Sequence, residues 1–248
     1  MIKIWLFPFF LVTLPTERYN NTAMKKFFLT TLVAMLCWTA SNAKVNGTEP
    51  EDNTPDGVEA VDMGLSVKWA NVNMGAKKST DFGDYYAWGE TKTKDYYSWD
   101  SYIWSRGNSP MLIKYSVNDR KSQLTLADDA ARANWGGKWR MPTEAECEEL
   151  ANPDNCTWEW TTKNGVNGYK VTSKKTGKSI FLPITGFRFY GRTQFRAIYG
   201  YYWTSTLYTT NPQNAICLEF NLDEVKVHNG NLSSNRFSGH CIRAVQEK

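Results

Sequence analysis

The second half of the chain contains four cysteines that could form disulfides: Cys147, Cys156, Cys217 and Cys241. In an oxidising compartment an even number permits complete pairing, with three possible connectivities. Cys147 and Cys156 lie on either side of a chain reversal expected at residues 152–153. The other two fall in expected late strands that could be neighbours. We therefore predict the disulfides Cys147–Cys156 and Cys217–Cys241, with buried free thiols as the alternative.

The histidines and serines do not form a familiar catalytic pattern. His228 and His240, the only two histidines, are twelve residues apart and lack the spacing of zinc ligands. The sequence contains neither a Gly-x-Ser-x-Gly elbow nor a phosphate-binding loop. We therefore predict no catalytic residue, no metal ligand and no cofactor.

One glycine-bounded segment, residues 186–200, has the composition of a binding loop. Its sequence, GFRFYGRTQFRAIYG, places three arginines among aromatic residues. Guanidinium groups hydrogen-bond carboxylates or sulfates, while aromatic faces stack on sugar rings or on partner side chains. The alternative is that the phenylalanines are core residues and the arginines are merely solvated. The predicted ligand-binding residues of this loop are Arg188, Tyr190, Arg192, Phe195 and Arg196.

A second aromatic cluster, residues 85–104, could provide a platform for stacking sugars. Most of its rings are expected to pack in the core, because large flat side chains bury much area in a domain with little helix. Trp99 and Trp104 are the members that we expect to be exposed, and we include them in the predicted ligand site.

The elements that must position these residues begin with two short helices. Residues 124–135, LTLADDAARANW, predict one helix with two aspartates in its first turn, where carboxylates complement the helix dipole. Thr143 and Glu146 form a capping box that starts a second helix, and Asn152-Pro153 ends it.

The rest of the chain predicts antiparallel strands of four to nine residues, separated by Asn, Gly, Pro or Ser clusters. A hairpin is expected at KKTG, with Gly177 in its turn. The predicted fold class is α+β, with short helices early and a meandering sheet late. The expected strands are residues 157–162, 168–173, 178–184, 200–208, 214–221, 224–229 and 240–246.

The first 57 residues predict export. Residues 24–43 have the basic start, apolar run and small-x-small end of a signal peptide, with cleavage near Ala43. We interpret residues 1–23 as an over-extended start, residues 44–57 as a solvated linker and residues 58–248 as a single domain. Lipidation of Cys37 is an alternative means of membrane association, although Leu36 precedes it instead of a small residue.

The charge of the exported chain argues against a nucleic-acid partner. Removal of residues 1–43 takes away four basic residues and one acidic residue, which leaves 25 basic and 24 acidic residues and a net charge of about +1. Binding driven by phosphate neutralisation needs a larger basic excess.

Five segments, in order, resemble the Fibrobacter succinogenes major paralogous domain, a family abundant in Bacteroidetes. The resemblance covers nearly the whole exported chain, from about Val61 to Val245. The segments are VDMGLSVKWANVNMGA, DFGDYYAWGE, ANWGGKWRMPTEAECEEL, NGVNGYKVTSKKTGKSIFLPITGFR and YGYYWTST.

This resemblance implies a C-type-lectin-like fold, and WRMPTEAE is similar to a run in formylglycine-generating enzymes, which vary the same fold. It gives the tryptophan-rich motif a structural explanation. Trp135 and Trp139 would pack the helices onto the sheet, residues 136–137 would allow a close turn, and Arg140 would tie the start of the helix to a carbonyl or carboxylate.

The same resemblance suggests an enzymatic alternative. Oxidases of the formylglycine-generating type need two adjacent thiolates near the C-terminal end of the domain, and only Cys241 lies there. We therefore expect an exported, non-catalytic binding module, periplasmic, on the cell surface or secreted, that recognises a glycan or an envelope protein. The alternatives are a degenerate oxidase of that type and a structural or adhesin subunit.

Overall fold

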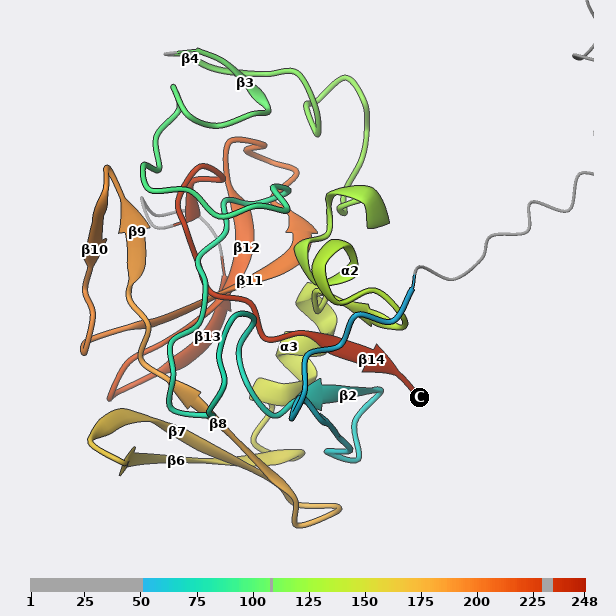
Figure 1. The fold of residues 1–248 in the computed structure, drawn as a ribbon, viewed down its shortest axis with the longest axis vertical. Coiled ribbons are helices and arrows are strands. Elements are labelled where there is room, and N and C mark those ends of the chain that lie inside the picture. Colours follow the sequence, from blue (N-terminus) through green and yellow to red (C-terminus); the bar gives the residue numbers. More distant parts are fainter. Residues whose placement is uncertain (1–50, 108, 229–233) are drawn as a thin grey trace, which may run out of the picture. The chain divides into compact units, whose positions relative to one another are not determined.

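The computed structural model describes residues 51–107, 109–228 and 234–248 (Figure 1). They belong to one compact unit, Glu49–Lys248. The predicted signal peptide, its cleavage near Ala43 and the lipidation of Cys37 lie outside the described residues.

The described chain has an α+β fold dominated by antiparallel sheet, as predicted. Its four-stranded sheet has the order β1-β2-β14-β5, with β1 (Ala60–Val61), β2 (Val67–Ala70), β5 (Trp139–Arg140) and β14 (Val245–Glu247). Two sheets have three strands each. One contains β6 (Cys156–Lys163), β7 (Val166–Ser173) and β8 (Ser179–Pro183), and the other contains β11 (Gly200–Leu207), β12 (Ala215–Phe220) and β13 (Val225–His228).

Two hairpins complete the described sheets. They are β3 (Ser105–Arg106) with β4 (Ser109–Leu112), and β9 (Phe187–Phe189) with β10 (Arg192–Gln194). The expected strand 240–246 is shorter than predicted, because its first residues make single bridges to Tyr86 and Tyr202 before β14 begins.

The first predicted helix is divided into two. A 3₁₀ helix, η1 (Leu126–Asp128), precedes α2 (Ala130–Trp135), and Asp129 lies between them with an extended backbone. The Asp129 carboxylate accepts a hydrogen bond from the Arg132 amide at 2.9 Å and therefore acts as the N-cap of α2. A side chain that bonds the backbone of the next turn favours a helix start at this point over continuation.

The second helix, α3 (Glu144–Ala151), is the one predicted. Thr143 accepts a bond from the Glu146 amide, and the Glu146 carboxylate accepts one from the Thr143 amide. Asn152 is the C-cap. The sequence pattern was sufficient to predict this helix, because the residues that fix each end bond to partners only three or four positions away in the chain.

The tryptophan-rich motif between the helices makes the packing contacts that the resemblance implied. The rings of Trp135 and Trp139 are buried and meet edge to face, with centroids 5.1 Å apart. Arg140 donates to the Met141 carbonyl oxygen at 3.2 Å and to both carboxylate oxygens of Glu146, at 2.7 and 2.8 Å. These contacts therefore fix the start of α3 next to β5 of the sheet.

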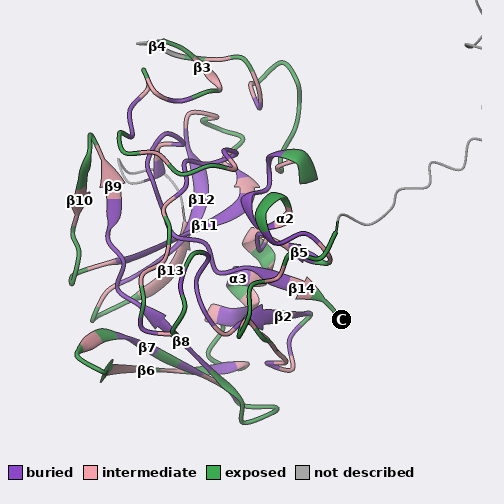
Figure 2. Ribbon diagram, viewed as in Figure 1, coloured by how far each residue is buried: buried purple, intermediate pink, exposed green. Residues whose placement is uncertain are grey.

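Most of the aromatic residues pack in the interior. Strands β11 and β12 are almost fully buried and run through the centre of the unit (Figure 2). The largest fully buried side chains include Trp69, Trp88, Trp139 and Trp203. The exposed residues concentrate on the hairpins and loops around this centre, including β10.

Candidate functional site

The predicted binding loop is an ordered hairpin at the edge of the unit (Figure 1). Phe189 pairs with Arg192, and the two residues between them, Tyr190 and Gly191, both have positive φ, at 45° and 75°. This is the backbone of the tight two-residue turn that matches the twist of paired strands. Phe187 is buried and anchors the base of the hairpin.

The alternation of side chains along the strands separates the three predicted arginines. Arg188 lies opposite Thr193 and shares its face of the hairpin, whereas Arg192 lies opposite Phe189 on the other face. Arg188 donates to the Asp95 carbonyl oxygen at 3.2 Å and lies 3.4 Å from the Thr193 hydroxyl. Arg192 is exposed. The hairpin therefore does not gather all three guanidinium groups on one ligand.

Arg196 reaches the same side of the unit as Arg188. Its guanidinium lies over the Phe82 ring, 4.9 Å from the centroid, and its positive charge is close enough to Tyr85 to affect the pKa of that side chain. Burial raises the pKa of Tyr85, and the nearby positive charges of Arg196 and Arg188 oppose that rise. Arg188 and Arg196 therefore flank one tyrosine.

A cavity of about 330 Å³ opens beside Arg188. It combines charged side chains of both signs with two tyrosines, and none of its lining residues except Arg188 was among the predicted site residues. The lining residues are Gly83, Asp84, Tyr85, Thr93, Lys94, Asp95, Tyr97 and Arg188.

The cavity walls are rigidly held. The Tyr85 hydroxyl donates to the Thr185 carbonyl oxygen at 2.6 Å, and the Tyr97 hydroxyl donates to the Tyr85 carbonyl oxygen at 2.6 Å. Gly75, with φ of 75°, makes room for Asp84, because a Cβ at this glycine would lie 2.3 Å from a carboxylate oxygen. Gly75 and Asp84 both lie in segments that carry the family resemblance. That resemblance is the only feature of the sequence that singled out these two residues.

Exposed aromatic rings border this region. Tyr96 and Tyr190 are 50% and 47% exposed, and their rings meet edge to face with centroids 5.7 Å apart. Phe195 is 51% exposed, stacks on Phe187 and meets Tyr199 edge to face. Of the predicted aromatic residues, Tyr190 and Phe195 are thus available to a ligand.

Trp99 and Trp104 were predicted to be exposed, but both are half-buried, and neither is among the residues that line the cavity. Trp99 packs edge to face on Phe237, whose ring also meets those of Phe189 and Tyr190. Trp104 donates to the Gly89 carbonyl oxygen at 2.8 Å. Through these contacts the two tryptophans pack against neighbouring loops. The structure does not bring them together with the predicted arginines of residues 186–200.

The cysteines differ from the prediction. All four are free and buried, so neither Cys147–Cys156 nor Cys217–Cys241 is bonded in the structure, which matches the stated alternative. Cys217 pairs with Trp203 on one side of β11, and Cys241 bridges Tyr202 on its other side. Two strand spacings, roughly 10 Å, therefore separate the second pair, beyond disulfide reach.

The free thiols of Cys147 and Cys156 are explained by their packing in the core. Cys147 and Cys156 both pack as small apolar side chains in the cluster formed with Leu150, Val171 and Leu182. Burial raises the pKa of the Cys156 thiol to about 11 and also raises the pKa of Cys147. Both side chains are accounted for as core residues, since free cysteine packs as a small hydrophobe.

The thiols also bear on the oxidase alternative. Burial raises the pKa of Cys217 to about 12 and raises the pKa of Cys241, so neither is held as a thiolate. Because β11 lies between them, these two cysteines do not provide the adjacent pair that copper-dependent oxidation would need.

Within the ranges that the structure describes, no group of three or more His, Cys, Asp or Glu side chains could hold a metal ion. Within the same ranges, no helix has both the length and the apolar character needed to cross a membrane. Comparisons with protein-family models, with curated proteins and with solved structures found no match.

Proposed function

We propose that this protein is an exported, non-catalytic binding module of C-type-lectin-like fold that recognises a glycan at the cell envelope. The observation that carries the proposal is the polar cavity beside Arg188, bordered by the exposed rings of Tyr96 and Tyr190. Export is proposed from the signal-peptide pattern of residues 24–43.

The chemistry of the cavity suits a sugar unit. Asp84 and Asp95 supply acceptors for sugar hydroxyls, while Arg188 and Thr93 supply donors. Aromatic faces at the border can stack on the apolar face of a pyranose ring. A site with a few placed polar groups and flanking rings orients its ligand by hydrogen bonds and holds it by stacking.

The arrangement of the elements supports the lectin-like assignment. The short helices lie between the early strands β1 to β4 and a later series of antiparallel strands, and long loops link β2 to β3 and β4 to η1. The family resemblance implies short helices packed on an antiparallel sheet with long loops. Membership of the Fibrobacter succinogenes major paralogous domain family is part of the proposal and rests on the five sequence motifs.

The two faces of the hairpin provide an internal control for the glycan test. We expect wild-type protein to bind a subset of glycans on an array, and Arg188→Ala to weaken that binding about tenfold, equivalent to about 1.4 kcal/mol. Arg192→Ala removes the same charge from the opposite face and should change binding less than twofold. Affinities measured by titration with the best array glycan give the comparison, and thermal unfolding monitors the fold of each variant.

Equal weakening by the two substitutions would show that the hairpin acts through overall charge and not through the cavity. Wild-type protein that binds no glycan would instead favour the partner-protein alternative. That alternative would use the exposed apolar side chains of Phe195 and Ile198, which are 51% and 55% exposed.

A further inference from the structure

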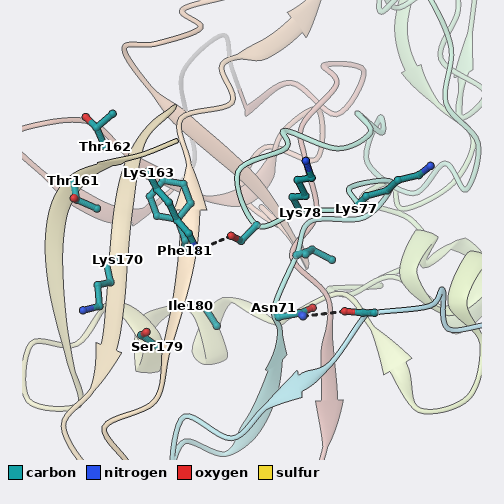
Figure 3. A pocket seen from close by; sticks show the side chains of 13 residues that line it. Asn71, Lys77, Lys78, Thr161, Thr162, Lys163, Lys170, Ser179, Ile180 and Phe181 are labelled. Atoms are coloured by element: carbon teal, nitrogen blue, oxygen red, sulfur yellow. Dashed lines mark hydrogen bonds between the residues drawn. The ribbon is translucent and has the colours of Figure 1, made fainter. Parts of the chain in front are cut away.

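We infer that a second site, a lysine-lined groove, binds a polyanionic polysaccharide. The groove has a volume of about 590 Å³ and lies between the loop that follows β2 and the β6–β8 sheet (Figure 3). It shares no lining residue with the cavity beside Arg188. Its lining residues are Gly57, Asn71, Val72, Lys77, Lys78, Ser79, Thr161, Thr162, Lys163, Lys170, Ser179, Ile180 and Phe181.

The charge of the groove is of one sign. Four lysines line it, from two separate parts of the chain, and none of its lining residues is acidic. No described residue forms an ion pair with any of the four. Their positive charge is therefore uncompensated within the groove, although the exported chain as a whole is nearly neutral.

Two carboxylates lie near the groove lysines but are not among the lining residues. Asp81 accepts hydrogen bonds from the backbone amides of Lys77 and Lys78, at 3.1 and 2.9 Å, and so fixes the loop that carries them. Glu159 lies opposite Lys170 in the strand register but is not among the lining residues. The loop is thus anchored by a carboxylate whose oxygen is occupied by backbone donors.

One lysine joins the two walls. The Lys163 ammonium donates to the Ser79 hydroxyl at 2.9 Å and lies 5.8 Å from the centroid of the Phe181 ring. Figure 3 shows Lys77 and Lys78 extending from the loop and Lys170 from the sheet, so that the charges are spread around the groove. A ligand that meets all of them must itself be extended and carry several negative charges.

The donor types favour a polysaccharide over a single phosphate. Ammonium groups on flexible stems act as point charges and do not impose the paired geometry of a guanidinium fork. The hydroxyls of Ser79, Thr161 and Ser179 add partners for sugar hydroxyls. Sulfate esters and uronate carboxylates share the chemistry that these lysines would recognise.

The same groove lacks the features expected for a nucleic acid. Single strands are held by stacking bases on accessible aromatic rings. Phe181 is the one aromatic residue in the lining and is only 4% exposed, which leaves no ring on which a base could stack.

The test uses dextran sulfate and polygalacturonate as probes, with neutral dextran and single-stranded DNA as comparators. We expect both polyanionic polysaccharides to bind, with affinity that falls as salt rises, and neutral dextran not to bind. Binding of only one acidic polysaccharide would assign the site to sulfate esters or to carboxylates. Lys163→Gln combined with Lys170→Gln should weaken binding at least tenfold and make its salt dependence shallower.

The matched control is Lys92→Gln combined with Lys174→Gln, which removes the same charge from exposed positions outside the lining. It should change affinity less than twofold, and Arg188→Ala should leave binding of these probes unchanged, so that failure of this site and failure of the glycan cavity are distinguishable. Equal loss in the control and groove variants would overturn the inference. Binding of single-stranded DNA as tightly as dextran sulfate would also overturn it.

Discussion

At the scale of single residues, the buried carboxylate of Asp129 connects the start of α2 to the segment that leads into α3. It caps α2 through the Arg132 amide and also accepts a bond from the Met141 amide at 2.8 Å, just before α3. Burial raises the pKa of Asp129 to about 6, and these backbone bonds oppose the rise. The protonated form is therefore favoured by folding, relative to an unfolded chain with the ordinary pKa of an aspartate.

This pKa shift predicts a specific pH dependence of stability. Because the folded pKa lies above the unfolded value, the stabilisation from Asp129 is complete below about pH 4 and is lost as pH rises through about 6. Asp129→Asn cannot ionise and resembles the protonated form. We expect wild-type protein to lose on the order of 2 kcal/mol of unfolding free energy relative to this variant between pH 4 and 7, measured by urea denaturation.

The other titrating groups contribute equally to both proteins, so the difference isolates Asp129. A difference in unfolding free energy that stays constant over this pH range would show that the carboxylate does not change its protonation there.

At the scale of elements, α3 depends on contacts made at its own ends. The capping box satisfies amides of the first turn, and Arg140 bridges both oxygens of Glu146 in a partly buried ion pair. Local chemistry of this kind is visible in a sequence, because all partners lie within six residues. The division of the first predicted helix was missed, since Asp129 was assigned to the helix dipole and not to a cap, although its capping bond to the Arg132 amide is local; its second bond, to the Met141 amide, comes from a later segment.

The cap predicts a measurable loss of stability. Thr143→Ala removes the hydroxyl that accepts from the Glu146 amide and should lower the unfolding free energy by about 1 kcal/mol, measured by chemical denaturation. Thr143→Ser retains an acceptor at the same position and serves as the matched control. Equal losses in the two variants would indicate that the threonine methyl group, and not the cap, stabilises the helix.

At the scale of the whole described unit, the C-terminal strand closes the fold. β14 lies in the middle of the four-stranded sheet, between β2 near the start and β5 in the middle of the chain (Figure 2). Val245 is fully buried and pairs with both Trp69 and Arg140. A strand at this position holds together segments far apart in sequence.

Removal of this strand should therefore be far more damaging than its length implies. Deletion of residues 245–248 exposes the hydrogen-bonding edges of both neighbouring strands and is expected to abolish cooperative thermal unfolding, measured by circular dichroism. Deletion of Lys248 alone removes an exposed ion pair with Asp62 at 3.1 Å and should leave cooperative unfolding close to the wild-type temperature, because exposed ion pairs contribute little to stability. Cooperative unfolding near the wild-type temperature after the longer deletion would contradict the closing role of β14.

The sequence by itself determined the α+β class, the capped α3 and the β7–β8 hairpin at Gly177. These features follow from periodicity, caps and turns, whose interacting groups are close along the chain. Of the predicted binding loop, Arg188 lines the candidate cavity, and the exposed ring of Tyr190 meets that of Tyr96 beside it.

Only the tertiary structure decided which side chains meet. The strand register set Arg192 apart from Arg188, and β11 separated Cys217 from Cys241. The folding of distant segments onto one another brought Asp84 to Arg188 and the loop lysines to those of the β6–β8 sheet. Such contacts depend on the three-dimensional path of the whole chain, so no local pattern of residues could specify them.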